Sequence, residues 1–122
     1  MSAPRLTLPR AARLAARDAI DGVFRDGKFA HGRLLVLGCR AAGGMLTRCA
    51  IIIPRKRCAK SSARNRTRRL LRELFRQSRP RLAPGYDVVV LPRAARAAGD
   101  FRRWSDEWQA LCRKAGLWRD AA

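Results

Sequence analysis

Apolar residues recur with a helical period in the middle of the chain, between Arg64 and Gln77. On a helical wheel of about 100° per residue, apolar residues and one threonine share an arc of about 140°, and polar residues fill the far side. The apolar arc holds Leu70, Leu74, Thr67, Leu71 and Phe75, and the far side holds Arg68, Arg72, Arg76, Arg69 and Asn65. The pattern predicts one helix with a packed face and an exposed arginine face. Ser61 and Ser62 are candidate caps for its start, and Pro80 must end it.

A short amphipathic helix is predicted nearer the start of the chain. Between Arg17 and Arg25, apolar residues recur at helical spacing, and Gly27 can end the helix. Before it, the stretch up to about Arg13 contains two prolines among isolated leucines. That composition predicts an extended arm rather than a helix.

A third helix is predicted to begin near Asp100, a favourable N-cap, and to end at Gly116. Its apolar stripe consists of Phe101, Trp104, Trp108, Leu111 and Ala115. Tryptophans can stack on nucleic-acid bases, but helical spacing indicates that Trp104 and Trp108 belong to the core. Trp118 lies beyond the helix, and its role stays open.

Three apolar runs predict strands. The first two, Gly32 to Arg40 and Thr47 to Ile53, flank two glycines, and an antiparallel hairpin is the simplest interpretation. Tyr86 to Leu91 is a further buried strand that Pro92 closes. The segment from Ala94 to Gly99 is the most loop-like part of the interior.

Composition bounds the class of protein. The chain has 122 residues, 48% of them hydrophobic, which suffices for one domain over residues 1–122 and a modest core. Its formal net charge is +19, and 24 of its 28 basic residues are arginine, whose planar fork suits phosphate. A nucleic acid is therefore the expected partner. No run of about 18 apolar residues is present, so no membrane partner is expected.

The cysteines and the single histidine do not indicate a metal site. Cys39, Cys49, Cys58 and Cys112 lack zinc-knuckle spacing, and His31 stands alone. The first ten residues lack the apolar core of a secretion signal. We therefore expect a cytoplasmic protein whose free thiols act as small apolar residues.

The arginine helix lies in the most basic part of the chain. Residues 54–81 contain twelve basic residues and one acid, Glu73. An ordinary solvated helix surface is the alternative, but such surfaces usually mix glutamate with lysine. The imbalance favours a phosphate-binding surface whose affinity depends strongly on salt.

The chain is poorly equipped for catalysis of its own. It has no recognisable histidine–carboxylate pair and no glycine-rich phosphate loop, and its acids are few. Two of them, Asp106 and Glu107, are expected to be solvated on the last helix. No catalytic residue is predicted, and any catalysis is assigned to a partner.

The run Arg64-Asn65-Arg66-Thr67-Arg68-Arg69-Leu70-Leu71-Arg72-Glu73 follows Ile53-Pro54-Arg55-Lys56 and precedes Phe75-Arg76. This arrangement closely resembles the signature of the bacterial ribonuclease P protein subunit. Residues 19–24 resemble the first helix of that family, and residues 86–90 resemble its last strand. The resemblance implies an α+β fold, a small two-layer α/β sandwich in the order α-β-β-β-α-β-α. It also implies a left-handed β-α-β crossover, against the general right-handed rule.

The resemblance implies a function as well. Family members assist a catalytic RNA that uses magnesium to cut the 5′ leader from precursor transfer RNA. The chain would be part of an endoribonuclease whose active site lies in the RNA and not in this chain. The magnesium ions would be bound mainly by the RNA, and none by the protein alone. The expected contacts with the RNA subunit are Arg64, Asn65, Arg66, Arg68, Arg69 and Arg72, with Arg68 and Arg72 the foremost. Arg64 can instead cover the core with its stem, and Asn65 can bond locally to the backbone.

The family also holds the leader between its first helix and its sheet. The residues that correspond here are Ile20, Phe24, Arg55, Lys56 and Arg93. The match is incomplete, because Ile20 stands where the family often has phenylalanine, and Gly38 stands where an aromatic is common. Phe29 is a possible substitute. We expect weaker base stacking and more backbone charge contacts, and Phe24 can equally be a core residue.

Two other classes of protein share some of these features. A non-enzymatic RNA-binding module of ribosomal or chaperone type would share the charge and the arginine helix, although it would not need the ordered motif. A DNA-binding helix-turn-helix protein would need a second helix close to the first. Pro80, Pro84 and Gly85, followed by a strand, argue against it, and no DNA partner is expected.

Overall fold

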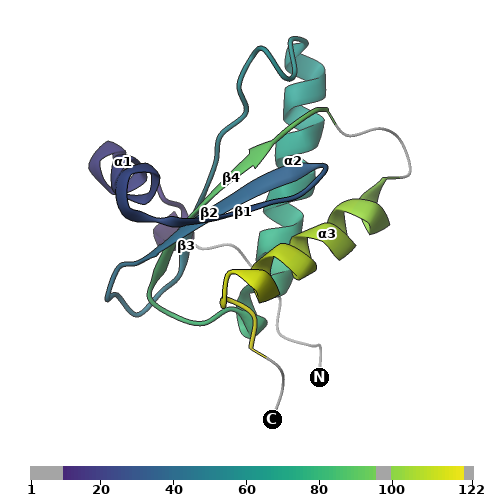
Figure 1. Ribbon diagram of the computed structural model, residues 1–122. Helices are drawn as coiled ribbons and strands as arrows, with labels where there is room; N and C mark the ends of the chain where they lie inside the picture. The colour runs from purple at the N-terminus through teal and green to yellow at the C-terminus, as the bar shows by residue number, and fades with distance from the viewer. Residues whose placement is uncertain (1–9, 96–99, 120–122) are drawn as a thin grey trace, which may run out of the picture.

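The computed structural model describes residues 10–95 and 100–119. In this part of the chain, a four-stranded sheet has one helix on one face and two helices on the other (Figure 1). The helices are α1 (Arg17–Asp26), α2 (Ser61–Ser78) and α3 (Phe101–Lys114), and the strands are β1 (Lys28–His31), β2 (Leu35–Ala41), β3 (Arg48–Ile51) and β4 (Tyr86–Pro92). The α+β class and the implied element order are confirmed. The larger core lies between the sheet and α2 and α3, and a smaller one lies between the sheet and α1 on the opposite face.

The predicted hairpin between the first two apolar runs is wrong. The order across the sheet is β1-β2-β4-β3, so β4 separates β2 from β3. β2 pairs antiparallel with both β1 and β4, whereas β3 pairs parallel with β4. The true hairpin partner of β2 is β1, a four-residue strand with too little apolar character to be predicted.

The central place of β4 follows from its composition. Val88, Val89 and Val90 are all buried, because successive side chains of this strand enter the cores on opposite faces of the sheet. The register between β3 and β4 is fixed by Arg48. Its Nε and Nη2 donate to the buried carboxylate of Asp87 at 2.9 Å each.

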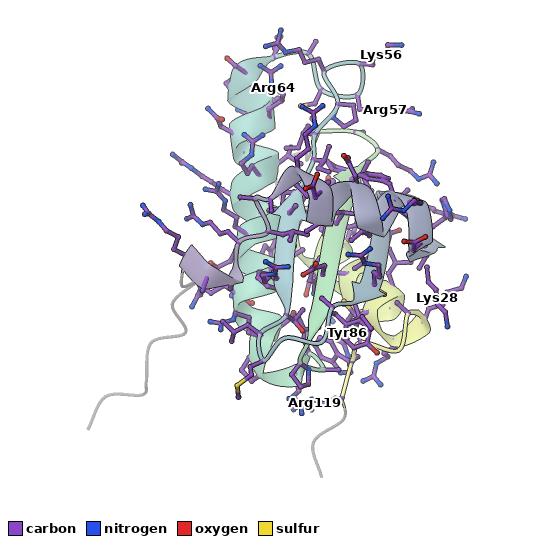
Figure 2. All side chains as sticks on the ribbon, turned by 90° about the vertical axis from the view of Figure 1, so that its left-hand side faces the viewer. Lys28, Lys56, Arg57, Arg64, Tyr86 and Arg119 are labelled. Atoms are coloured by element: carbon purple, nitrogen blue, oxygen red, sulfur yellow. The ribbon has the colours of Figure 1, made fainter. Side chains whose placement is uncertain are left out.

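The connection from β3 through α2 to β4 joins two parallel neighbours. In Figure 2, which looks onto the α1 face, β3 and β4 run upward, β4 lies to the right of β3, and α2 runs behind the sheet. The crossover is therefore left-handed, as the resemblance implied.

The helix α2 forms as the apolar period predicted. Five residues of its predicted packed face are buried, namely Thr67, Leu70, Leu71, Leu74 and Phe75. The predicted serine caps are wrong, because the N-cap residue is Lys60 and no side chain caps the first turn. The helix ends at Ser78, two residues before Pro80, which lies in a 3-10 turn (Arg79–Arg81).

The start of the described chain is attached to the sheet. Of the predicted arm, residues 1–9 lie outside the described residues. Arg10–Ala12 form a 3-10 turn in which Ala12 is buried, and the amide of Leu14 donates to the Cys49 carbonyl at 3.0 Å. Residues 10–14 therefore run along β3, which is an edge strand.

The helix α3 places its tryptophans as predicted. Trp104 and Trp108 are buried, and the indole of Trp108 donates to the Ser78 hydroxyl at 2.8 Å. The helix ends before Gly116, whose φ of +77° is a left-handed conformation that suits glycine. Asp100 occupies the N-cap position without capping through its side chain. Trp118 lies half-buried against the main core.

Glu107 was expected to be solvated, and this prediction is wrong. Its carboxylate accepts hydrogen bonds of 2.8 Å from the backbone amides of Arg33, Leu34 and Leu35. A side chain on α3 thus closes the turn between β1 and β2. Helical position alone showed only that Glu107 lies beside the tryptophan stripe, and the turn that it meets is more than seventy residues away in the chain.

The cysteines are small buried residues, as predicted, and all four are free. Three of them, Cys39, Cys49 and Cys112, belong to the main core. Burial raises the pKa of the Cys49 and Cys39 thiols and raises that of Cys112 to about 12. These thiols are therefore uncharged at neutral pH.

Candidate RNA-binding surface

The predicted RNA-subunit residues all lie on α2, but they differ in exposure. Asn65, Arg66, Arg69 and Arg72 are exposed, whereas Arg64 and Arg68 are half-buried. Figure 2 shows Arg64 near the upper end of α2, beside the loop that carries Lys56 and Arg57. The rigid helix presents these groups in a fixed array, which lowers the entropy lost on binding a polyanion.

Arg64 has a structural role within the described residues. Its Nη1 donates to the carbonyls of Cys58 and Ala59, at 3.1 Å and 2.7 Å. The guanidinium group thereby fixes the loop that leads into α2. Because an arginine has five N–H donors, Arg64 retains donors for an RNA phosphate while it holds this loop.

The lower part of α2 differs from the upper part because its arginine is paired. Arg76 Nε donates to Glu73 at 2.9 Å, and the amide of Gln77 also donates to Glu73. Hydrogen bonding from Arg76 lowers the pKa of Glu73, and the same bond raises the pKa of Arg76. This pair neutralises the surface below Arg72. The exposed positive charge of the helix is therefore concentrated between its start and Arg72.

A cavity of about 260 Å³ brings together two sets of residues that the sequence kept apart. Ile20, a predicted leader residue on α1, lines it together with Arg68 and Arg72 of α2. Arg13 lines the same cavity and was missed, because nothing in the sequence separated it from the other arginines of the predicted arm. Burial lowers the pKa of Arg72, and the positive charges of Arg13 and Arg68 lower it further.

The aromatic residues of the α1 face meet as a pair. The rings of Phe24 and Phe29 stack with their centroids 5.8 Å apart, and Phe24 remains 45% exposed. Phe29 lies over Gly38, where an added Cβ would come within 2.4 Å of the ring. Phe29 thus fills the space that an aromatic on β2 would take. The exposure of Phe24 shows that it is not a core residue.

The three basic leader candidates lie at the carboxyl end of the parallel strands. Arg55 and Lys56 follow β3, and Arg93 follows β4, which is the adjacent strand. All three are exposed, and the amide of Arg93 donates to Leu34 at 2.8 Å. Arg93 Nη2 also lies 3.4 Å from His31 Nδ1. The structure therefore gathers Arg55, Lys56 and Arg93 at one end of the sheet, and places Phe24 on the face.

Within residues 10–95 and 100–119, no three histidine, cysteine, aspartate or glutamate side chains gather as metal ligands. None of the helices in the described part of the chain has the length and apolar character needed to cross a membrane.

Comparison with known proteins gives a consistent result. The family model described as Ribonuclease P matches residues 8–116. The ribonuclease P protein component of Chlamydia trachomatis is 38% identical over 103 residues, which cover 84% of each chain. The ribonuclease P protein component of Roseiflexus castenholzii is 33% identical over 111 residues, which cover 90% of each chain.

Solved structures agree with this result. The RNase P protein from Thermotoga maritima is 28% identical and superposes with a TM-score of 0.71, covering 83% of this chain and 96% of that one. The RNase P protein of Staphylococcus aureus has a TM-score of 0.78 at 16% identity, covering 90% of this chain and 100% of that one, which shows a shared fold. Since the family model spans most of the sequence and the curated relatives cover most of it, this chain belongs to the ribonuclease P protein family.

Proposed function

We propose that this chain binds the catalytic RNA of ribonuclease P through α2 and the 5′ leader of precursor transfer RNA through the α1 face. The observation that carries the proposal is the arrangement of charge. Arg66, Arg69 and Arg72 of α2 are exposed and form no ion pair with the described residues, and basic residues gather beside the helix at the carboxyl end of β3 and β4. This distribution supports RNA binding both along α2 and at the carboxyl end of the strands.

The contact with the catalytic RNA is assigned to the arginine motif. Arg66, Arg68, Arg69 and Arg72, together with Asn65, present forked donors to phosphates, and Arg64 contributes the donors that its loop contacts leave free. The contact releases counterions, so binding weakens steeply as salt rises. Positive charge beside crowded phosphates also lowers their mutual repulsion. The protein should therefore reduce the magnesium concentration at which the holoenzyme is active.

The leader is assigned to the α1 face and the strand ends. Phe24, supported from below by Phe29, offers an exposed ring on which one base can stack. Ile20 contributes apolar surface beside it, and Arg55, Lys56 and Arg93 contact the backbone of the leader. Mature transfer RNA lacks this segment, so the contacts favour the precursor over the product.

Cleavage itself is assigned to the RNA. Hydrolysis of a phosphodiester needs hard oxygen ligands that place magnesium ions, and RNA phosphates supply them. The described residues of this chain offer no comparable cluster. The protein positions both RNAs and screens their charge, and the cytoplasm is the compartment in which we expect the complex.

The deciding experiment measures 5′ cleavage of a precursor transfer RNA by the catalytic RNA of the same organism at low magnesium, with and without the protein. Stimulated cleavage at the mature 5′ end is expected. Cleavage at high magnesium without protein serves as the control for the RNA. Tight, salt-sensitive binding without stimulation would contradict the proposal and indicate a general RNA-binding module.

A further inference from the structure

The cavity at the edge of the sheet has an unusual lining. It lies along β3, between the segment that begins at Arg13 and the middle of α2. Its lining includes the apolar side chains of Leu14, Ile20 and Ile52, which we call the apolar floor, together with Arg13, Arg68 and Arg72. None of the described residues that line the cavity is an acid. Three positively charged residues therefore share one cavity with apolar side chains.

Arg13 is held in this place by the backbone rather than by its side chain. It forms a parallel bridge with Cys49, and the amide of the next residue donates to the carbonyl of Cys49 at 3.0 Å. A further bond of 3.0 Å joins the amide of Arg13 to the carbonyl of Arg10. The side chain is thus carried by a segment fixed to an edge strand, and its guanidinium group is left available.

The three arginines lack protein partners in the described part of the chain. No side chain or carbonyl of residues 10–95 and 100–119 accepts a hydrogen bond from their guanidinium groups, and none forms an ion pair with them. Some other arginines of the molecule are paired, as Arg48 is with Asp87 and Arg76 is with Glu73. Like charges brought together without an acid repel each other, and a bound anion removes that repulsion.

The size of the cavity bears on the kind of anion. Its volume of about 260 Å³ falls below the range of about 300–1,000 Å³ that is usual for drug-sized ligands. The apolar floor would be unused by a lone inorganic anion. One nucleotide of a polymer matches both kinds of lining residue, because its phosphate can contact the arginines while its sugar or base covers the apolar floor.

We propose that Arg13, Arg68 and Arg72 clamp one backbone phosphate of the catalytic RNA, and that the attached, unstacked nucleoside packs on Leu14, Ile20 and Ile52. The inference rests on the proposed function, adds Arg13 to the RNA-binding residues, and assigns Ile20 to the catalytic RNA instead of the leader. The catalytic RNA is the chosen source, because two of the three arginines belong to the face of α2 already assigned to it. The nucleotide is unstacked, since a paired base could not enter a cavity at the sheet edge.

The test compares Arg13→Ala with Arg102→Ala, a matched loss of one exposed arginine on α3. The dissociation constant of the protein–catalytic RNA complex is measured over a range of salt concentrations. For Arg13→Ala we expect about tenfold weaker binding and a salt slope smaller by about 0.7–0.9, the loss of one phosphate contact. For Arg102→Ala we expect less than twofold weakening and an unchanged slope.

A second measurement separates a binding role from a structural one. Without RNA, Arg13→Ala should melt at the same temperature as the wild type or higher, because the substitution removes repulsion between Arg13 and Arg72. In a double-mutant cycle, Arg13→Ala and Arg72→Ala should weaken RNA binding less than additively, since they share one phosphate. A lower melting temperature combined with an unchanged salt slope would overturn the clamp.

The source of the nucleotide is tested separately. If Arg13→Ala leaves binding to the catalytic RNA unchanged but reduces the preference for precursor over mature transfer RNA, the assignment to the catalytic RNA is overturned. If the wild type itself neither binds the RNA nor stimulates cleavage, the proposed function fails. A wild type that does both, with an Arg13→Ala variant that matches Arg102→Ala, contradicts the clamp alone.

Discussion

The two faces of the sheet are covered very differently. Between the sheet and α2 and α3 lies a large core that includes Trp104, Trp108 and Phe75. Between the sheet and α1 lies a small cluster of four buried residues, Leu14, Val23, Ala50 and Val89, beside the exposed ring of Phe24. Neighbouring residues of the same strands serve both faces. We call the side with α2 and α3 the thick face and the side with α1 the thin face, and the contrast indicates that the thick face contributes most of the stability of the fold.

The largest effect is expected from the thick face. Trp108→Ala removes a buried indole and its bond to Ser78, and should lower the free energy of unfolding by about 3–5 kcal/mol. Urea unfolding followed by circular dichroism measures the loss. Phe24→Ala, on the thin face, is the matched comparison and should cost less than about 1 kcal/mol. Similar losses for the two variants would contradict the division of roles.

The next prediction concerns substitutions that weaken RNA binding without changing the fold. Arg68→Glu with Arg72→Glu reverses two charges, and should weaken binding of the catalytic RNA by at least about 100-fold while leaving the circular dichroism spectrum unchanged. The same charge change on α3, Arg102→Glu with Lys114→Glu, is the control and should weaken binding far less. Filter binding at several salt concentrations measures both variants. If the α2 variant binds the catalytic RNA normally, the assignment of RNA binding to α2 is wrong.

Glu107 of α3 holds the turn between β1 and β2 through three hydrogen bonds. We expect its replacement to have an intermediate effect on stability. Glu107→Gln replaces a charged acceptor of three backbone bonds, and should lower the free energy of unfolding by about 2 kcal/mol. Hydrogen exchange should accelerate at the amides of residues 33–35. The neighbouring substitution Asp106→Asn, at an exposed position, should change neither quantity. Unchanged exchange in Glu107→Gln would show that the turn is held by other contacts.

The thin face should affect substrate preference. Phe24→Ala should reduce the preference for precursor over mature transfer RNA by about tenfold, because stacking contributes about 1–3 kcal/mol per base. Competition binding of the two RNAs to the assembled holoenzyme measures the preference. Phe101→Ala removes a comparably exposed ring from α3 and should leave the preference unchanged. An equal loss in the two variants would argue against a stacked leader base.

The smallest effect concerns the buried thiols of the thick face. The raised pKa of Cys112, about 12 against an ordinary 9.0, favours the neutral thiol in the folded state. Its stabilisation is complete below pH 9 and is lost as the pH rises toward 12, by about 1 kcal/mol at pH 10. Urea unfolding at pH 8 and pH 10 measures the difference. Cys112→Ala should show a smaller difference between the two pH values, and an equal one would contradict the assignment.

The sequence by itself determined the elements whose pattern is long and periodic. The apolar residues of α2 and the tryptophans of α3 recur every three or four positions, so local geometry alone places each on one face. The ordered arginine motif likewise indicated the family before the fold was known. For the same reason the candidate residues of α2 could be named from the sequence, because one helix carries all of them.

Tertiary structure decided what depends on distant partners. β2 pairs with β4 rather than with β3 because β4 is buried on both faces of the sheet. The local sequence of β2 and β3 does not reveal this pairing. The carboxylate of Glu107 meets amides more than seventy residues away, and Arg13 meets Arg72 only because its segment runs along β3. Periodicity reports which face of an element a residue occupies, whereas packing decides what lies opposite it.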